Sequence, residues 1–205
     1  MKINLINRHL FWNINNKTNY SNNTICILND EFKVNILLIT KCGSTSIRNF
    51  IDYREKLYNE LNENEKKYTK ICFVRDPEKR FYSGLNTILQ RNNRKTKKFL
   101  SAYKKANLID YILNNKDEHL TSMSLLIKNI NVEHIYNLDI INKLPKKPSC
   151  PTNNKVFTDK IINEIRDKNI FSDDKLVNYY KEDFNLYSKA TKYVIPKVSK
   201  LFKNF

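Results

Sequence analysis

The sequence predicts an α/β fold with a short central parallel sheet flanked by helices. Two observations predict this class. Residues 32–40 and 68–74 are rich in Ile, Leu and Val, as is typical of buried strands in parallel sheets. A segment with apolar residues at roughly helical spacing follows each of these runs. The 205 residues suit one domain, and an apolar content of 40% is enough to form a core.

The first half of the chain predicts a cover followed by two strand–turn–helix units. Residues 1–30 alternate short apolar groups with Asn-rich turns, which favours short strands or an irregular N-terminal cover. The first buried strand stops at residues 41–46, and a helix is expected over 47–61. The second strand leads into Arg-Asp-Pro, and Pro77 is well suited to the first turn of the next helix.

The second half predicts one more strand and a helical tail, within a single domain over residues 1–205. The expected elements are a basic loop or helix end at 90–98, helices at 99–113 and 118–130, a strand at 133–138, a short helix capped by Asp139 and ending at 144, a Pro-rich loop at 145–154 and helices over 155–205.

The chain is strongly basic, with 37 Lys and Arg against 21 Asp and Glu and a formal net charge of +16. A charge of this size indicates an anionic partner such as a nucleotide, an acidic polymer, nucleic acid or a membrane surface. Lys outnumbers Arg 29 to 8, and Asn and Ile are abundant, so the bias of an AT-rich genome is an equally good explanation of the total charge. That bias does not explain where individual Arg residues lie.

The four Cys, at positions 26, 42, 72 and 150, include no Cys-x-x-Cys pair, and only three His are present, so no zinc or other metal site is expected. Cys26 and Cys72 lie in apolar runs and are expected to be buried free thiols. No apolar run approaches the roughly 18 residues of a membrane helix. The N-terminus lacks a secretory-type stretch, and a cytoplasmic location without a membrane span is expected.

The turn after the first buried strand is the most informative segment. It reads Lys41-Cys42-Gly43-Ser44-Thr45-Ser46 and leads directly into a helix. Backbone N–H groups at such a helix start favour an anion, and Gly43 allows close approach of the backbone. The three hydroxyls add donors and Lys41 adds a charge. A Ser-capped helix with an incidental Lys is the structural alternative.

This turn is not a Walker A loop, because that motif places its Lys directly after a glycine. Lys-x-Gly-Ser-Thr-Ser after a strand resembles the 5′-phosphosulfate loop of sulfotransferases, which use 3′-phosphoadenosine 5′-phosphosulfate (PAPS) as their donor. The resemblance implies a P-loop-like three-layer fold. It also implies that residues 41–46 bind the donor.

A second turn carries the same resemblance independently. Residues 73–84 read FVRDPEKRFYSG and are similar to the RDPxxRxxS pattern of the membrane-enzyme type of sulfotransferase (family 2), which modifies carbohydrates. In that family the first Arg and the Ser bind the 3′-phosphate of the donor, which implies this role for Arg75 and Ser83. The physical reasoning agrees, since an Arg at the carboxyl end of a strand projects into the crevice where α/β folds bind ligands. A structural ion pair between Arg75 and Asp76 is the alternative, although Arg80 is the expected partner of Asp76.

Three further segments resemble the family in the same order. Residues 117–123 are similar to an HWxPQ-like element, residues 133–144 to the strand and short helix after it, and residues 176–189 to a closing YxxDFxLF helix. The resemblance thus covers about residues 33–190. The chain departs from the pattern at Leu120, Ser122 and Met123, and it is short between Lys41 and Arg75, where several relatives carry a catalytic acid or His.

The implied activity is transfer of a sulfonyl group from PAPS to a hydroxyl or amine of an acceptor, with a carbohydrate as the expected acceptor and no metal. Lys41 is the expected partner of the leaving oxygen. His119 is the first candidate for the general base, oriented by Asp117 or Glu118, and its alternative is a capping or packing role. Glu55, Glu60 and Glu63 are held in reserve.

Two other classes of function compete with this hypothesis. A nucleotide-dependent phosphotransferase is disfavoured by the missing Walker A loop. A basic nucleic-acid-binding module is disfavoured because no recognised binding motif is present and the positive charge is spread along the chain, so nucleic acid is not an expected partner. The identity of the acceptor is left open.

Overall fold

The computed structural model describes residues 24–51, 53–91, 94–105, 107–114, 117–141, 155–191 and 196–201. Its fold is α/β, as expected. A five-stranded mixed sheet has the strand order β3-β1-β2-β4-β5. The strands are β1 (Ile25–Asn29), β2 (Val34–Leu38), β3 (Arg54–Leu57), β4 (Thr69–Val74) and β5 (His134–Asn137).

The three strands expected from the sequence, β2, β4 and β5, are parallel to one another. The centre of the sheet is therefore parallel, as expected, but the sheet as a whole is mixed, because β1 runs antiparallel to both β2 and β3. The hairpin between β1 and β2 leaves only four residues, 30–33, for the connection, and so short a connection joins antiparallel strands. Residues 1–30 were expected to form a cover, and positions 1–23 of this segment lie outside the described residues. Most of the remaining positions, 24–30, belong to β1.

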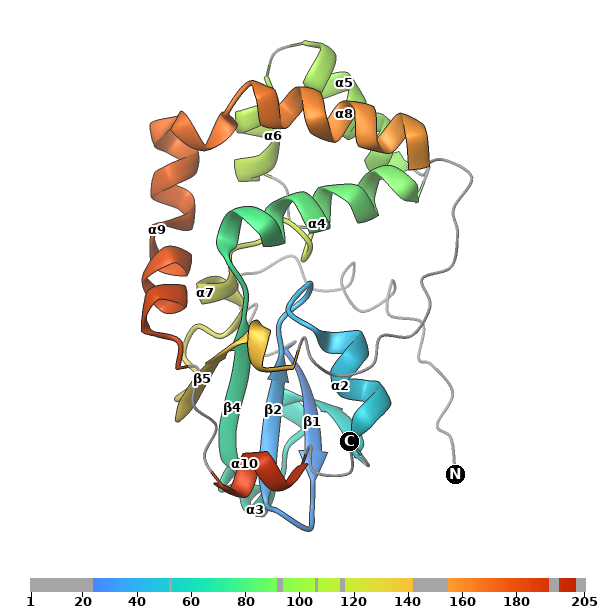
Figure 1. Ribbon diagram of the computed structural model, residues 1–205. Helices are drawn as coiled ribbons and strands as arrows, with labels where there is room; N and C mark the ends of the chain where they lie inside the picture. Colours follow the sequence, from blue (N-terminus) through green and yellow to red (C-terminus); the bar gives the residue numbers. More distant parts are fainter. Residues whose placement is uncertain are drawn as a thin grey trace.

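Helices cover both faces of the sheet and the carboxyl ends of its parallel strands (Figure 1). They are α2 (Ser44–Phe50), α3 (Glu63–Lys66), α4 (Pro77–Gln90), α5 (Arg94–Lys104), α6 (Leu108–Asn114), α7 (Met123–Leu126), α8 (Lys155–Asp167), α9 (Asp174–Lys189) and α10 (Pro196–Leu201), with short 3-10 turns η2 (Tyr58–Glu60), η3 (Leu138–Ile140) and η4 (Ile170–Ser172).

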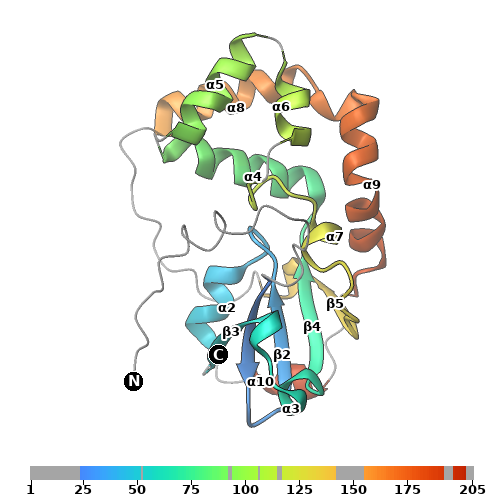
Figure 2. The same cartoon turned by 180° about the vertical axis from the view of Figure 1, so that it is seen from behind.

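Two apolar clusters sandwich the sheet. One face packs against α2 and α10, through residues such as Ile47 and Val198, and the other packs against α7 through Met123 and Leu126. Figure 2 shows α3 on the face opposite to α10. Cys26 and Cys72 are buried on the α7 face as free thiols, as expected, and burial raises the pKa of Cys26 to about 12.

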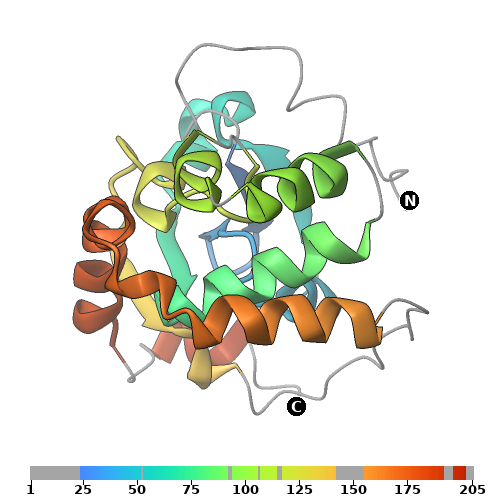
Figure 3. The ribbon, with the colours of Figure 1, turned by 90° about the horizontal axis from the view of Figure 1, so that it is seen from above.

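A third apolar cluster lies above the carboxyl ends of β2 and β4 and is formed by helices together with Leu120 of the 117–121 turn. It joins α4, α5, α6, α8 and α9 around side chains such as Phe81, Phe99 and Tyr180. Seen from above, α4 and α8 run side by side across the sheet (Figure 3). The helical layer therefore closes over the sheet edge at which α/β folds bind ligands.

Several predicted helices differ from the observed elements. The helix expected over 47–61 ends at Phe50, and residues 54–57 instead form the edge strand β3. Pairing with β1 decides this, because residues 54–57 supply hydrogen-bond partners for the side of β1 that faces away from β2. The helix expected over 118–130 is reduced to α7, and that expected over 99–113 is divided between α5 and α6. The Pro-rich loop at 145–154 lies outside the described residues.

The prediction of an ion pair between Arg80 and Asp76 is wrong. Arg80 is completely buried, and its guanidinium donates hydrogen bonds of 2.9, 2.8 and 3.0 Å to the carbonyl oxygens of Thr40, Thr121 and Glu118. Asp76 instead caps α4 by accepting a bond from the Lys79 N–H. Arg80 therefore fastens the end of β2 and the 117–121 turn to α4.

We expect Arg80→Met to lower the free energy of unfolding by about 2–4 kcal/mol, because each carbonyl left buried without a donor costs about 1–3 kcal/mol. Chemical denaturation of the variant against the parent chain measures this difference. Lys79→Met on the same helix is the control, since Lys79 is exposed and its loss should change the stability by less than about 0.5 kcal/mol. Equal stabilities of the two variants would contradict the fastening role of Arg80.

Candidate functional site

The loop between β2 and α2 lies at the carboxyl edge of the sheet and has an unusual backbone. Lys41 and Gly43 both have positive φ, at 68° and 79°. A Cβ atom added to Gly43 would lie 2.5 Å from Leu138 Cδ1 and 2.7 Å from Ile141 Cδ1. Glycine is therefore required both by the left-handed backbone and by the close packing of the η3 turn.

The three amides that follow this glycine take no part in the hydrogen bonds of α2. The Ile47 N–H donates the first bond of α2, to the Gly43 carbonyl at 2.9 Å, so the N–H groups of Ser44, Thr45 and Ser46 have no partner within the helix. Their side chains are half-buried or exposed. Because α2 has only seven residues, its dipole is weak, and attraction for an anion must come mainly from side-chain charge.

Cys42 faces away from this surface. Its thiol is buried with Sγ 3.6 Å from Met123 Sδ, and burial raises its pKa to about 11. Its N–H donates to the Ile39 carbonyl at 3.0 Å. Cys42 thus fixes the loop and presents neither its thiol nor its amide hydrogen to a ligand.

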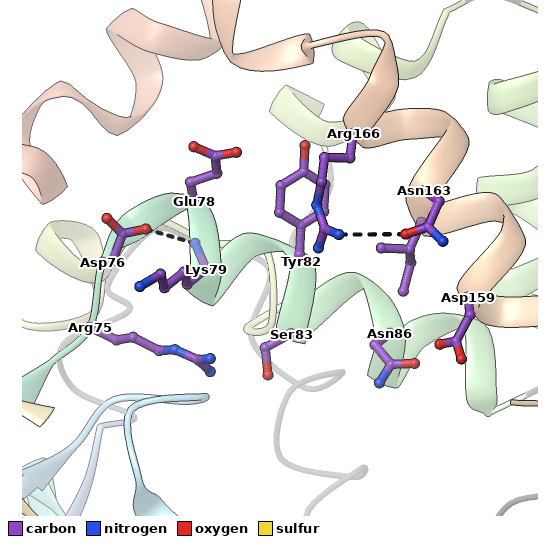
Figure 4. Close-up of a pocket in the computed structure, with 11 residues that line it drawn as sticks. Arg75, Asp76, Glu78, Lys79, Tyr82, Ser83, Asn86, Asp159, Asn163 and Arg166 are labelled. Atoms are coloured by element: carbon purple, nitrogen blue, oxygen red, sulfur yellow. Dashed lines mark hydrogen bonds between the residues drawn. The ribbon is translucent and has the colours of Figure 1, made fainter. Parts of the chain in front are cut away.

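Arg75 and Ser83 line the same pocket, an open cavity of about 700 Å³ between α4 and α8. Arg75 directly follows the end of β4, and Ser83 lies in the second turn of α4. The Arg75 guanidinium extends along α4 toward Ser83, and both side chains point to the same side of that helix (Figure 4). No hydrogen bond or ion pair joins Arg75 to Asp76 in the described part of the chain.

The other half of this pocket is built by α8. Arg166 lies over the ring of Tyr82 at 4.8 Å from the ring centre, and Asn163 accepts a long hydrogen bond of 3.4 Å from it (Figure 4). Asp159 and Asn86 line the far end of the cavity. The pocket is therefore lined by charges of both signs. Arg75, Lys79 and Arg166 are positive, and Asp76, Glu78 and Asp159 are negative.

Positive charge converges on Lys41. Burial lowers the pKa of Lys41, and the neighbouring charges of Arg91, Arg75 and Arg80 lower it further. Glu118 acts in the opposite direction. Within the described residues, no ion pair to a carboxylate involves Lys41, Arg75 or Arg91. An anion bound here would relieve this mutual repulsion, so the cluster has the electrostatic character of an anion site.

No sequence pattern singles out Arg91, which lies in a stretch expected to be a basic loop or helix end. It lies at the carboxyl end of α4, and its guanidinium donates a 3.3 Å hydrogen bond to His119 Nε2. Its contact with His119 depends on where the 117–121 turn folds. No local sequence signal marks that arrangement.

His119 is buried at the centre of that turn. Its Nδ1 lies 2.6 Å from Asp117 Oδ1, so Asp117 orients the ring as expected. Nε2 is the atom that faces Arg91. The His119 carbonyl lies so close to α4 that a Cβ on Gly84 would be 2.1 Å from its oxygen, and Gly84 is the residue that permits this contact.

The helix α9 holds the same turn from the other side. Tyr180 donates a 2.5 Å hydrogen bond to the Leu120 carbonyl. The buried carboxylate of Asp183 accepts bonds of 2.6 Å from the Ser122 hydroxyl, 2.8 Å from the Met123 N–H and 2.9 Å from the Ser124 N–H. Two segments that are 60 residues apart in the sequence are thus joined beside the site.

The remaining base candidates have partners in other parts of the fold. The Glu55 carboxylate accepts hydrogen bonds from Arg48, Glu60 accepts one from the Leu57 N–H, and Glu63 forms an ion pair with Lys66. The structure brings none of these three side chains into contact with the Lys41 loop.

Comparisons with family models, curated proteins and solved structures found no match for this chain. The described residues contain no cluster of His, Cys, Asp and Glu suited to a metal ion. Among the helices of the described ranges, none combines the length and apolar character needed to cross a membrane.

Proposed function

We propose that this protein is a PAPS-dependent sulfotransferase that transfers a sulfonyl group to a hydroxyl or amine, most simply of a carbohydrate. The observation that carries the proposal is that Arg75 and Ser83 line one pocket, while the charge of Arg75 also acts on Lys41. Residues 41–46 are not part of the pocket lining. ATP has no 3′-phosphate, whereas PAPS offers one anionic group to each of these two regions.

The two anionic groups of PAPS, the 5′-phosphosulfate and the 3′-phosphate, are assigned to the two phosphate-binding turns of the site. The amides and hydroxyls of residues 44–46 bind the 5′-phosphosulfate, and Lys41 stabilises the bridging oxygen as it gains negative charge. Arg75 binds the 3′-phosphate with its planar guanidinium, and the Ser83 hydroxyl adds a donor. The fold would then be P-loop-like, with β2–α2 and β4–α4 supplying the two phosphate-binding turns of a three-layer architecture.

The reaction is an in-line displacement at sulfur. The acceptor oxygen or nitrogen forms a bond to sulfur, the bond from sulfur to the bridging phosphate oxygen breaks, and adenosine 3′,5′-bisphosphate leaves. The acceptor's proton passes to a general base. The cations around Lys41 favour the charge that develops on the leaving oxygen, and this preference for the transition state is what accelerates the reaction.

Incubation with radiolabelled PAPS and a panel of glycans tests the proposal. We expect label to appear in an acceptor or, more slowly, as free sulfate, together with adenosine 3′,5′-bisphosphate. Labelled ATP in a parallel reaction is the control for a phosphotransferase, and binding to duplex DNA with a steep salt dependence is the control for a nucleic-acid-binding module. Transfer from ATP but not from PAPS would contradict the proposal.

A further inference from the structure

We infer that Glu118, and not His119, is the general base that removes the acceptor's proton, and that His119 is a positioning residue for Arg91. This inference rests on the proposed sulfotransferase function. It follows from which atoms of the 117–119 turn already have partners and which do not.

Both ring nitrogens of His119 are occupied. Asp117 Oδ1 lies 2.6 Å from Nδ1 and also accepts the His119 backbone N–H at 3.0 Å, which assigns the ring hydrogen to Nδ1. Nε2 then offers its lone pair to the Arg91 guanidinium at 3.3 Å. Transfer of a proton to Nε2 would break that bond and place two cations face to face. His119 is therefore arranged to hold Arg91 in place.

In contrast to the His119 ring, the Glu118 carboxylate has a hydrogen-bond partner at only one of its two oxygens in the described part of the chain. Its Oε2 accepts a 3.0 Å hydrogen bond from the Thr40 hydroxyl, and its backbone carbonyl is held by buried Arg80 at 3.0 Å. No hydrogen bond is recorded for Oε1 within the described ranges. The carboxylate is thus fixed through Oε2 by Thr40, the residue that precedes Lys41 in the chain, and is available through Oε1.

The charge around Lys41 supports the same choice. Glu118 is the carboxylate whose charge acts on Lys41, yet the two side chains do not form an ion pair within the described structure. The other charges that act on Lys41 are those of Arg91, Arg75 and Arg80, all positive. A carboxylate that accepts a proton in this setting becomes neutral, whereas an imidazole would add a further positive charge.

The proton balance is complete with Glu118 as base. The acceptor O–H bond breaks as its oxygen bonds to sulfur, the proton moves to Oε1, and the electron pair of the bond between sulfur and the bridging oxygen leaves with the bisphosphate. When water is the acceptor, the products are sulfate, adenosine 3′,5′-bisphosphate and protonated Glu118, which returns its proton to solvent.

Release of sulfate from radiolabelled PAPS, with water as the acceptor, tests this assignment. We expect Glu118→Gln to lower the rate by about 10²–10⁴-fold, the usual contribution of a general base, and to abolish the acid limb of the pH–rate profile. Affinity for adenosine 3′,5′-bisphosphate and the melting temperature should stay within about twofold and a few degrees of the parent values. Glu118→Asp should restore part of the rate and the acid limb.

His119→Gln is the discriminating variant, because the Gln carbonyl oxygen can accept from Arg91 but the amide is not a base. We expect it to keep the acid limb and to lose only a few-fold in rate. Glu31→Gln, in the exposed β1–β2 turn, is the matched control and should behave as the parent chain.

The outcomes separate the inference from the proposed function. Failure of the parent chain to bind adenosine 3′,5′-bisphosphate would contradict the sulfotransferase proposal itself. Bisphosphate binding without sulfate release by the parent, a normal rate in Glu118→Gln, or loss of the acid limb in His119→Gln would each overturn the assignment of Glu118.

Discussion

Lys41→Ala is expected to lower the rate of sulfonyl transfer by about 10²–10³-fold, the usual loss when one preorganised charge or donor at a developing oxyanion is removed. Binding of adenosine 3′,5′-bisphosphate should weaken far less. The negative charge on the bridging oxygen grows mainly in the transition state, and an interaction made there acts on turnover more than on affinity. Steady-state kinetics and product binding, measured on the same variant, separate the two effects.

The fold should tolerate this substitution. Lys41 already has a left-handed backbone, which Ala adopts at a cost similar to that for Lys, and removal of one charge from the cluster relieves repulsion. Lys128→Ala, an exposed position outside the site, is the control and should have normal kinetics. Normal turnover in Lys41→Ala would show that Lys41 lies near the site but does not stabilise the transition state.

Arg75→Ala is expected to weaken binding of adenosine 3′,5′-bisphosphate by about ten- to a hundredfold. A hydrogen bond to a charged group is worth about 1.5–3 kcal/mol, and about 1.4 kcal/mol corresponds to a tenfold change in affinity. Binding of AMP should hardly change, because AMP lacks the 3′-phosphate that Arg75 is proposed to bind. Calorimetric titration of both nucleotides into both proteins gives the four affinities required.

Ser83→Ala extends this comparison, since Ser83 lines the same pocket. Its hydroxyl makes a weaker contact than a guanidinium, so a loss of a few-fold is expected, again for the bisphosphate and not for AMP. Equal losses for the two nucleotides in Arg75→Ala would show that Arg75 acts on the pocket as a whole and not on the 3′-phosphate.

The central strands and α4 were predictable from the sequence for local reasons. Residues 34–38 and 69–74 are almost continuously apolar, which suits strands buried on both faces, and Asp76 with Pro77 marks the start of α4. The edge strand β3 was not predictable in this way. Its spacing of Tyr53 and Leu57 also fits a helix, and only pairing with β1 selects the strand.

In the site, too, some residues could be predicted from the local sequence, whereas others are positioned by contacts between distant segments. The sequence placed Lys41 and Arg75 directly after the two buried strands and Ser83 in the helix that follows Arg75, and the structure brings Arg75 and Ser83 into one pocket. The position of Glu118 depends on buried Arg80, whose bonds to the Glu118 and Thr121 carbonyls hold the 117–121 turn against α4. Contacts over such sequence separations leave no periodic pattern that could have revealed them.

The central claim is that this site recognises the 3′-phosphate of a phosphoadenosine donor. Titration of the parent chain with adenosine 3′,5′-bisphosphate and with AMP, under identical conditions in a calorimeter, tests it most directly. The account predicts that the bisphosphate binds at least about tenfold more tightly, since Arg75 contributes one charge-assisted contact to it alone. Equal affinities for the two nucleotides, or no measurable binding of either, would contradict it.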